Sequence, residues 1–312
     1  MIDSKAGIIG LAVGDAMGVP LEFCMREKLM QNSTTEMIGY GSHNVPKGSW
    51  SDDSSMTFAT IDAIITDKAI SCDTIATNFL EWMKNAKYTP TDKVFDIGRT
   101  CLRAIAKFES KQEIAEKCGG ISEMDNGNGS LMRILPLVYY CYAKNMKEQE
   151  IYEVVKKVSS ITHGHEISVM GCFIYVMYGI ELLNNKNLSQ AYKKIKKIKY
   201  STYFSEETIK RYERILKKNI NQYSLDEIKS TGFVIDTLEA TLWVLLNTNS
   251  YNQSIIGAIN LGNDTDTVGA CVGGLAGIYY GFENINKTWQ SELLKYDFII
   301  DLCNKFNSVL NN

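Results

Sequence analysis

The chain has 312 residues, 45% of them hydrophobic and 22% charged, and its formal net charge is -3. This composition is typical of a globular protein, and so small a net charge gives no electrostatic reason to expect nucleic acid or an anionic membrane surface as a partner. The eight cysteines form no C-x-x-C pair and stand mostly in apolar runs. They favour a reduced, cytoplasmic protein over a disulfide-stabilised one.

Apolar residues recur every three or four positions along most of the chain, which is the period of a helix buried on one face. In chain order, this pattern predicts helices over 4–17, 54–66, 74–84, 93–108, 131–143, 148–160, 167–183, 234–248 and 252–260. No run alternates at a period of two, so no strand is expected. Only four prolines occur, and no Pro/Gly/Ser-rich linker divides the chain. The sequence therefore predicts an all-α protein with a single domain over residues 1–312.

The most apolar and the most polar stretches are interpreted within the same helical fold. The run 167–183 is shorter than the roughly 20 residues that a membrane span needs, so it is predicted to be a buried helix. The stretch 184–230 contains KKIKKIKY and KRYERILKKN and is expected to be a solvated helical pair or a surface excursion. No heptad repeat or large exposed apolar stretch is evident, which favours a monomer.

Two segments carry a glycine at every fourth position: Gly10, Gly14 and Gly18 in the first, and Gly269, Gly273, Gly277 and Gly281 in the second. Glycine inside a helix costs about 1 kcal/mol relative to alanine, so a repeated glycine needs a compensating reason. Small residues on one face allow two helix backbones to approach closely. We therefore expect these two helices, or each with another central helix, to pack tightly in the middle of the protein.

Three patches of acidic and hydroxyl residues lie where a loop meets a helix: Asp15 with Glu22, the sequence SDDS from Ser51, and the sequence NDTDT from Asn263. Taken one at a time, each patch is consistent with helix capping, because such side chains bond the free amides of a first turn. Two acidic patches packed face to face would repel each other unless a cation lay between them.

The ligand chemistry of these patches favours a hard cation. Carboxylate and hydroxyl oxygens without cysteine or converging histidine suit Mg²⁺ or Mn²⁺ better than Zn²⁺. The number of carboxylates exceeds what one Mg²⁺ usually takes from a protein, so a site with two ions about 3.5–4 Å apart fits better.

The blocks GLAVGDAMGVPLEF, WSDDSSMTFATIDAI, FDIGRT, NGNGSLMRILPL, ITHGH and INLGNDTDTVGACVGGLAGIYYG follow one another in this order. In this order and spacing the chain resembles the ADP-ribosylglycohydrolase family, which includes dinitrogenase reductase-activating glycohydrolases and ADP-ribosylarginine hydrolases. The resemblance implies an orthogonal bundle of helices with a central cleft that holds two Mg²⁺ or Mn²⁺ ions.

The resemblance also implies roles for the acidic patches. The residues matching the family's metal ligands are Ser51, Asp52, Asp53, Asp264, Asp266 and Thr267. Glu22 matches a glutamate near the metals that acts on the leaving group or on water, and Asp53 is assigned to the catalytic centre as well as to the metal. The family often has threonine at the position of Ser51, and serine keeps the ligating hydroxyl.

A second set of matched residues concerns the substrate: Asp96, Gly127, Asn128, Gly129, Ser130, Met132 and His163. The glycine-rich loop would line the ADP-ribose site and continue into a helix, where exposed amides accept a phosphate closely. In the arginine-specific branch of the family, Asp96 matches a position facing the acceptor guanidinium, which a carboxylate can bind through two hydrogen bonds. Arg99 stands where the family often has asparagine, which leaves the exact acceptor open.

These expectations combine into a metal-dependent hydrolase that removes ADP-ribose from a modified protein side chain, arginine before others. Glu22 would serve as the acid/base group. The alternatives are a hydrolase for serine-type O-linked ADP-ribose, a non-catalytic ADP-ribose-binding protein, and a phosphohydrolase that cleaves the pyrophosphate. An ADP-ribosylated protein is the expected partner and ADP-ribose the expected product, with no role for nucleic acid or membrane.

Overall fold

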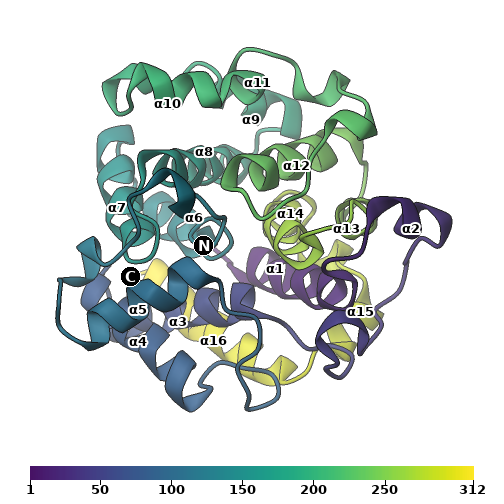
Figure 1. Cartoon of the computed structure of the whole chain (residues 1–312), viewed down its shortest axis with the longest axis horizontal. Helices are drawn as coiled ribbons and strands as arrows, with labels where there is room; N and C mark the ends of the chain where they lie inside the picture. Colours follow the sequence, from purple (N-terminus) through teal and green to yellow (C-terminus); the bar gives the residue numbers. More distant parts are fainter.

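The computed structural model describes residues 1–312 and contains helices without a β-strand; only isolated bridges occur. The α-helices are α1 (Lys5–Gly18), α2 (Arg26–Gln31), α3 (Asp52–Asp67), α4 (Cys72–Asn85), α5 (Arg99–Glu109), α6 (Leu135–Ala143), α7 (Glu148–Ser160), α8 (Glu166–Leu183), α9 (Leu188–Ile195), α10 (Glu206–Arg211), α11 (Glu213–Leu216), α12 (Val234–Asn247), α13 (Tyr251–Ile259), α14 (Thr265–Tyr280), α15 (Lys287–Glu292) and α16 (Tyr296–Leu310). Figure 1 shows α1 and α14 at the centre, with the other helices arranged around them in several directions. The predicted all-α fold is confirmed.

The close contact between α1 and α14 depends on the two glycine stripes. A Cβ atom added at Gly14 would lie 1.9 Å from the carbonyl oxygen of Gly269, and one added at Gly273 would lie 2.2 Å from that of Gly10. No side chain fits in these places, so the two backbones touch directly. The expected central pair is confirmed. Gly281 is the exception among the predicted glycines, because it ends α14 with a φ of +85° and a Cβ atom added there would meet no atom within 4 Å.

A single connected cluster of 86 buried hydrophobic residues forms the core. Helix α8 lies within it, in contact with α6, α7, α12 and α14. By length and composition α8 could cross a membrane, but 72% of its apolar window is buried inside the fold. This burial is that of a core helix, as predicted for 167–183.

Two predicted helices begin later than expected. The range 93–108 is helical only from Arg99, because Asp96 has a φ of +50° and Gly98 is the N-cap of α5. The range 131–143 is helical only from Leu135, where a proline occupies the first turn of α6. In both cases the residues before the helix form loops, and these loops carry residues of the candidate site.

Helix α16 was not predicted, although its buried residues recur at intervals of three and four: Ile299, Leu302, Cys303, Phe306 and Leu310. It packs against α1 and α3, and Asn307 accepts hydrogen bonds from the backbone and hydroxyl of Ser4 at 2.8 and 2.7 Å. The polar stretch 184–230 forms α9, α10 and α11, which lie along one edge of the molecule (Figure 1).

Candidate active site

The acidic residues of the site stand at the first turns of two helices. Ser51 is the N-cap of α3, and its hydroxyl accepts a hydrogen bond from the amide of Asp53 at 3.3 Å. Asp264 occupies the same place at α14. The amino end of a helix carries a partial positive charge and free amides, so carboxylates are favoured there. Capping therefore explains why these residues begin helices, but not why so many carboxylates meet.

The two acidic patches meet directly. Thr267 donates a hydrogen bond from its hydroxyl to Asp53 Oδ2 at 3.3 Å, across 214 residues of sequence. Ser51 Oγ lies 3.0 Å from the same oxygen. The expected meeting of the patches is therefore found, and Asp53 stands between them.

Asp15 fixes the position of α3. Its carboxylate accepts hydrogen bonds from the amides of Ser51 and Ser54 at 2.9 and 3.0 Å, and from their hydroxyls at 2.9 and 2.6 Å. Burial raises the pKa of Asp15 to about 6, although these hydrogen bonds act to lower it. Asp15 thus joins α1 to the start of α3 and is a positioning residue of the site.

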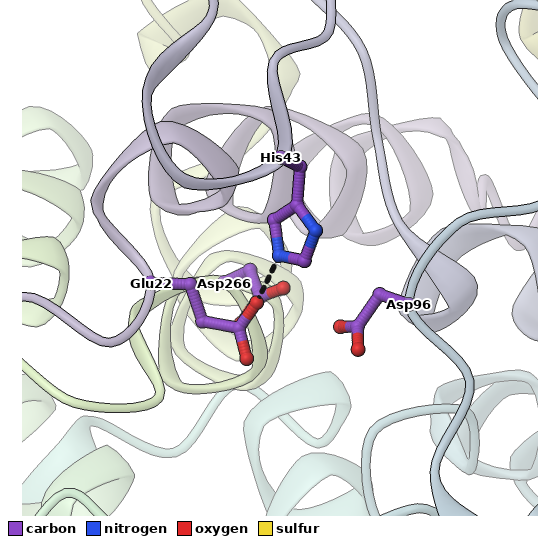
Figure 2. Close-up of side chains that lie close together, drawn as sticks. All are labelled: Glu22, His43, Asp96 and Asp266. Carbon is purple, nitrogen blue, oxygen red and sulfur yellow. Dashed lines mark hydrogen bonds and ion pairs between the residues drawn. The ribbon is translucent and has the colours of Figure 1, made fainter.

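Glu22, His43, Asp96 and Asp266 form a second group, in which one ligand atom from each lies within 4.8 Å of the others. Figure 2 shows these side chains converging from separate segments, with His43 bonded to Glu22. Burial raises the pKa of Glu22 to about 7; the hydrogen bond from His43 opposes this shift, and the carboxylates of Asp96 and Asp264 add to it. Such a value suits a group that exchanges protons near neutral pH.

Sequence reasoning missed His43. It lies in a short 3-10 helix, Gly41–His43, outside every predicted element. Its ring lies near those of Phe23 and Phe95, with centroids 5.9 and 5.2 Å away. The hydrogen bond with Glu22 raises the pKa of His43. Its one sequence signal was rarity, because the chain has only three histidines.

The buried carboxylates of the site destabilise the protein when no cation is bound. Burial raises the pKa of Asp52, Asp53 and Asp266 well above the usual value, and neighbouring carboxylates raise each of them further. Asp53 Oδ1 and Asp266 Oδ2 are buried without any hydrogen-bond partner. Buried charges need a partner or a metal. These oxygens therefore fit a hard divalent cation, while the number and identity of the ions remain predictions.

The glycine-rich loop is joined to the second acidic patch. Asn128 donates hydrogen bonds from Nδ2 to Asp264 Oδ2 at 2.7 Å and to Thr237 Oγ1 at 2.9 Å. The loop does not continue into a helix as expected, since α6 begins only at Leu135. The side chains of Ser130 and Met132 are buried, so these two residues face the core.

His163 lies against this loop. A Cβ atom added at Gly129 would lie 2.8 Å from His163 Cε1, and one added at Gly127 would lie 3.6 Å from Nε2. Glycine at both positions leaves room beside the imidazole ring. The predicted substrate residues of the loop and His163 are therefore brought together, and Asn128 connects them to the carboxylates.

The fold and the site together define an all-helical hydrolase whose carboxylates converge from the starts of α3 and α14. The chain belongs to the ADP-ribosylglycohydrolase family, since the model of that family matches residues 4–311. It is accordingly a glycohydrolase.

Individual relatives cover almost the same length. The chain is 30% identical over 302 residues to the ADP-ribosylarginine hydrolase Tri1 of Serratia proteamaculans (strain 568), covering 96% of this chain and 77% of that protein. It is 26% identical over 289 residues to the ADP-ribosyl-[dinitrogen reductase] glycohydrolase of Rhodospirillum rubrum, covering 91% and 88%. A solved structure titled ADP-ribosylglycohydrolase-related protein complex has the same fold, with a TM-score of 0.82 at 23% identity over 99% of this chain and 98% of that one.

Proposed function

We propose that the enzyme removes ADP-ribose from a modified arginine side chain of a protein, with the help of bound divalent cations. The observation that carries this proposal is the convergence of Glu22, Asp96 and Asp266 within 4.8 Å. One group suited to acid/base work, one free carboxylate and one candidate metal ligand thus face the same space. The names of the relatives from Serratia proteamaculans and Rhodospirillum rubrum support the substrate class.

The cations would be held by the oxygens of the two helix starts: Ser51, Asp52, Asp53, Asp264, Asp266 and Thr267. Two Mg²⁺ or Mn²⁺ ions are proposed, because one Mg²⁺ rarely takes so many protein carboxylates. When bound, such ions supply Lewis-acid stabilisation of oxygen atoms on the sugar. The buried, unpartnered oxygens of Asp53 and Asp266 support this assignment.

Glu22 is proposed as the acid/base group. Its raised pKa of about 7 allows the carboxyl either to hold or to accept a proton near neutral pH. His43 bonds one carboxyl oxygen and orients the group, and Glu22 Oε1 remains for the substrate or water. Glycosidases usually place two free carboxylates at the scissile bond. Here the remaining carboxylates are assigned to the cations or to the acceptor.

Asp96 is proposed to select arginine. Its carboxyl is partly accessible, and it is carried by a loop that precedes α5. Burial raises the pKa of Asp96, so a cationic guanidinium would favour its charged form. A carboxylate can bind a guanidinium through two parallel hydrogen bonds. A serine acceptor has no guanidinium and cannot form this pair. We further propose a cytoplasmic protein, in keeping with eight free cysteines, and a monomer.

Incubation with ADP-ribosylated arginine and serine peptides tests these proposals, with Mg²⁺, Mn²⁺ or EDTA present and the products identified by mass spectrometry. We expect intact ADP-ribose from the arginine peptide alone, and none with EDTA. Asp96→Asn should lower kcat/KM for the ADP-ribosylated arginine peptide about tenfold or more, because it removes a charge-assisted hydrogen-bonded pair. Release from serine would overturn the acceptor assignment. AMP as the product would indicate a phosphohydrolase, and tight ADP-ribose binding without release would indicate a non-catalytic binder.

A further inference from the structure

Arg133 is a cation sealed in the core behind the glycine-rich loop. Its side chain is 0% exposed, and no carboxylate pairs with it. One guanidinium nitrogen, Nη2, donates to the carbonyl of Val158 at 3.1 Å and to Thr162 Oγ1 at 2.8 Å. The guanidinium lies over the ring of Phe79, 4.7 Å from its centroid. Nε and Nη1 of the same side chain are buried without a hydrogen-bond partner. Burying a cation without a counter-charge is costly, so the presence of Arg133 at this position calls for a reason.

The direction of the Arg133–Thr162 hydrogen bond is fixed by chemistry. Arginine carries only donors and does not lose its proton in proteins, so Thr162 Oγ1 must accept. The threonine hydroxyl then has one proton of its own to donate. His163 Nδ1 lies 2.9 Å from that oxygen, and an imidazole nitrogen is a much better acceptor for this proton than the nearby thiol of Cys101. This comparison of the two acceptors favours a His163 Nδ1 that carries no proton of its own.

The other ring nitrogen of His163 faces the loop. Burial, with help from the charge of Arg133, lowers the pKa of His163 to about 3, so the ring is neutral at physiological pH. A neutral imidazole carries one N–H, and with Nδ1 as the acceptor this N–H is at Nε2. Nε2 bonds to no protein group, and the residue as a whole is 2% exposed. It lies beside Gly127 and Gly129, where side chains are absent.

We infer that Arg133 and Thr162 are positioning residues that hold His163 in its Nε2–H form, so that it offers a neutral hydrogen-bond donor to an oxygen of ADP-ribose above the loop. This inference rests on the proposed function only for the identity of the ligand. The tautomer itself is a property of the free protein. A neutral donor keeps the same charge across physiological pH, whereas an ordinary histidine would change charge with pH near its pKa of about 6.5.

The tautomer can be read directly by NMR on protein labelled with nitrogen-15 histidine. The chain has only three histidines, so His43→Gln and His165→Gln variants assign the spectrum by elimination. We expect a proton on Nε2 of His163 and none on Nδ1, unchanged between about pH 6 and pH 8. A proton on Nδ1, or a ring that titrates in this range, would overturn the inference whatever the enzyme hydrolyses.

Substitutions of Thr162 separate this role from simple packing. Thr162→Ser keeps the hydroxyl and should keep both the tautomer and the affinity for ADP-ribose. Thr162→Val keeps the shape but removes the hydroxyl, and should give a mixture of tautomers and about tenfold weaker ADP-ribose binding by calorimetry. Cys101→Ala removes the rival acceptor and should leave the tautomer unchanged.

The possible results are distinct. If Thr162→Val does not fold, the spectra of the wild type and of Thr162→Ser still decide the tautomer. An Nε2–H form that persists in folded Thr162→Val with unchanged affinity would overturn the role of Thr162. If ADP-ribose does not bind the wild type while the tautomer is as expected, the proposed function fails and the assignment of the tautomer stands.

Discussion

The two sides of the site differ in how far the protein satisfies its own polar groups. On the loop side, Asn126 accepts hydrogen bonds from the amide and hydroxyl of Ser168 at 3.2 and 2.9 Å, and Asn128 donates two. On the carboxylate side, Asp53 and Asp266 each leave a buried oxygen without a partner. The two asparagines of the loop side are therefore satisfied by the protein alone, whereas the carboxylates of Asp53 and Asp266 each leave an oxygen that a cation would satisfy.

This difference indicates which side of the site stabilises the metal-free protein and which side destabilises it. A satisfied hydrogen-bond network stabilises the fold, and removing one member leaves a partner unsatisfied. Clustered buried carboxylates destabilise the fold until a cation binds, and removing one of them relieves repulsion. Substitutions on the two sides should therefore change the stability of the metal-free protein in opposite directions.

The largest effect is expected from Asp53→Asn. Loss of a carboxylate from between the two helix starts should lower kcat about a thousandfold or more, by weakening cation binding. The same change should raise the melting temperature in EDTA, because it removes a buried, repelled charge. Parallel assays of turnover and thermal unfolding test both effects.

The matched control for this variant is Asp62→Asn on the same helix. Asp62 lies away from the site and pairs with Lys87 at 3.0 Å. The Asp62→Asn substitution should leave kcat unchanged and should not raise the melting temperature in EDTA. A metal-free Asp53→Asn protein less stable than the wild type would contradict the proposed opposition between the two sides.

Glu22→Gln should lower kcat by about a hundredfold to a thousandfold, the range for loss of an acid/base group. The amide still reaches His43 but cannot exchange a proton, so binding of ADP-ribose should be retained. Stopped-assay kinetics and calorimetry on the same preparation separate the two effects. Full turnover together with normal cation binding would remove Glu22 from the mechanism.

On the loop side, Asn128→Ala should weaken ADP-ribose binding about tenfold and destabilise the metal-free protein. The change removes two hydrogen bonds and leaves Asp264 and Thr237 without this donor. Calorimetry with ADP-ribose and thermal unfolding in EDTA measure the two effects. A variant that is more stable than the wild type in EDTA would show that the loop side also carries unrelieved repulsion.

The smallest expected effect is a dependence of stability on pH. The pKa of Glu22 rises from an ordinary 4.5 to about 7, and that of Asp15 from 3.8 to about 6. The folded protein therefore binds these protons more tightly than the unfolded chain, so its stability falls as the pH rises between the two values of each group. In EDTA, the melting temperature should be several degrees lower at about pH 8 than at about pH 5.

Saturating Mn²⁺ should reduce or remove this decrease, because the bound cation favours the charged carboxylates. The profile of Glu22→Gln should be flatter than that of the wild type, since glutamine does not titrate. A melting temperature in EDTA that rises with pH over this window would contradict the raised pKa values.

Much of the fold follows from local patterns that the sequence displays openly. The glycine stripes predicted the contact of α1 with α14, and the apolar run predicted the burial of α8. The acidic patches predicted two helix starts that meet, because capping and metal binding use the same residue types. The apolar residues of α16 also recur at helical spacing, so this helix too was predictable from the sequence.

The parts that could not be predicted depend on irregular backbone. Asp96 lies in a stretch whose apolar spacing continues that of α5, and nothing in the sequence signals its positive φ. His43 reaches Glu22 from a short 3-10 helix, and a lone histidine in a loop carries no spacing to interpret. The path of a loop over a folded core depends on tertiary contacts, which local propensity does not contain.

The contact between α1 and α14 also affects how the protein folds during its synthesis, because the two helices lie far apart in the sequence. Thr265 bonds the carbonyl of Gly18 at 2.8 Å, and these residues are 247 positions apart. Helix α1 is synthesised well before α14, so its glycine face stays uncovered until α14 has emerged. Closing so long a loop is slow. A nascent chain that lacks α14 has only one of the two acidic helix starts, so we expect hydrolysis to require that α14 has emerged.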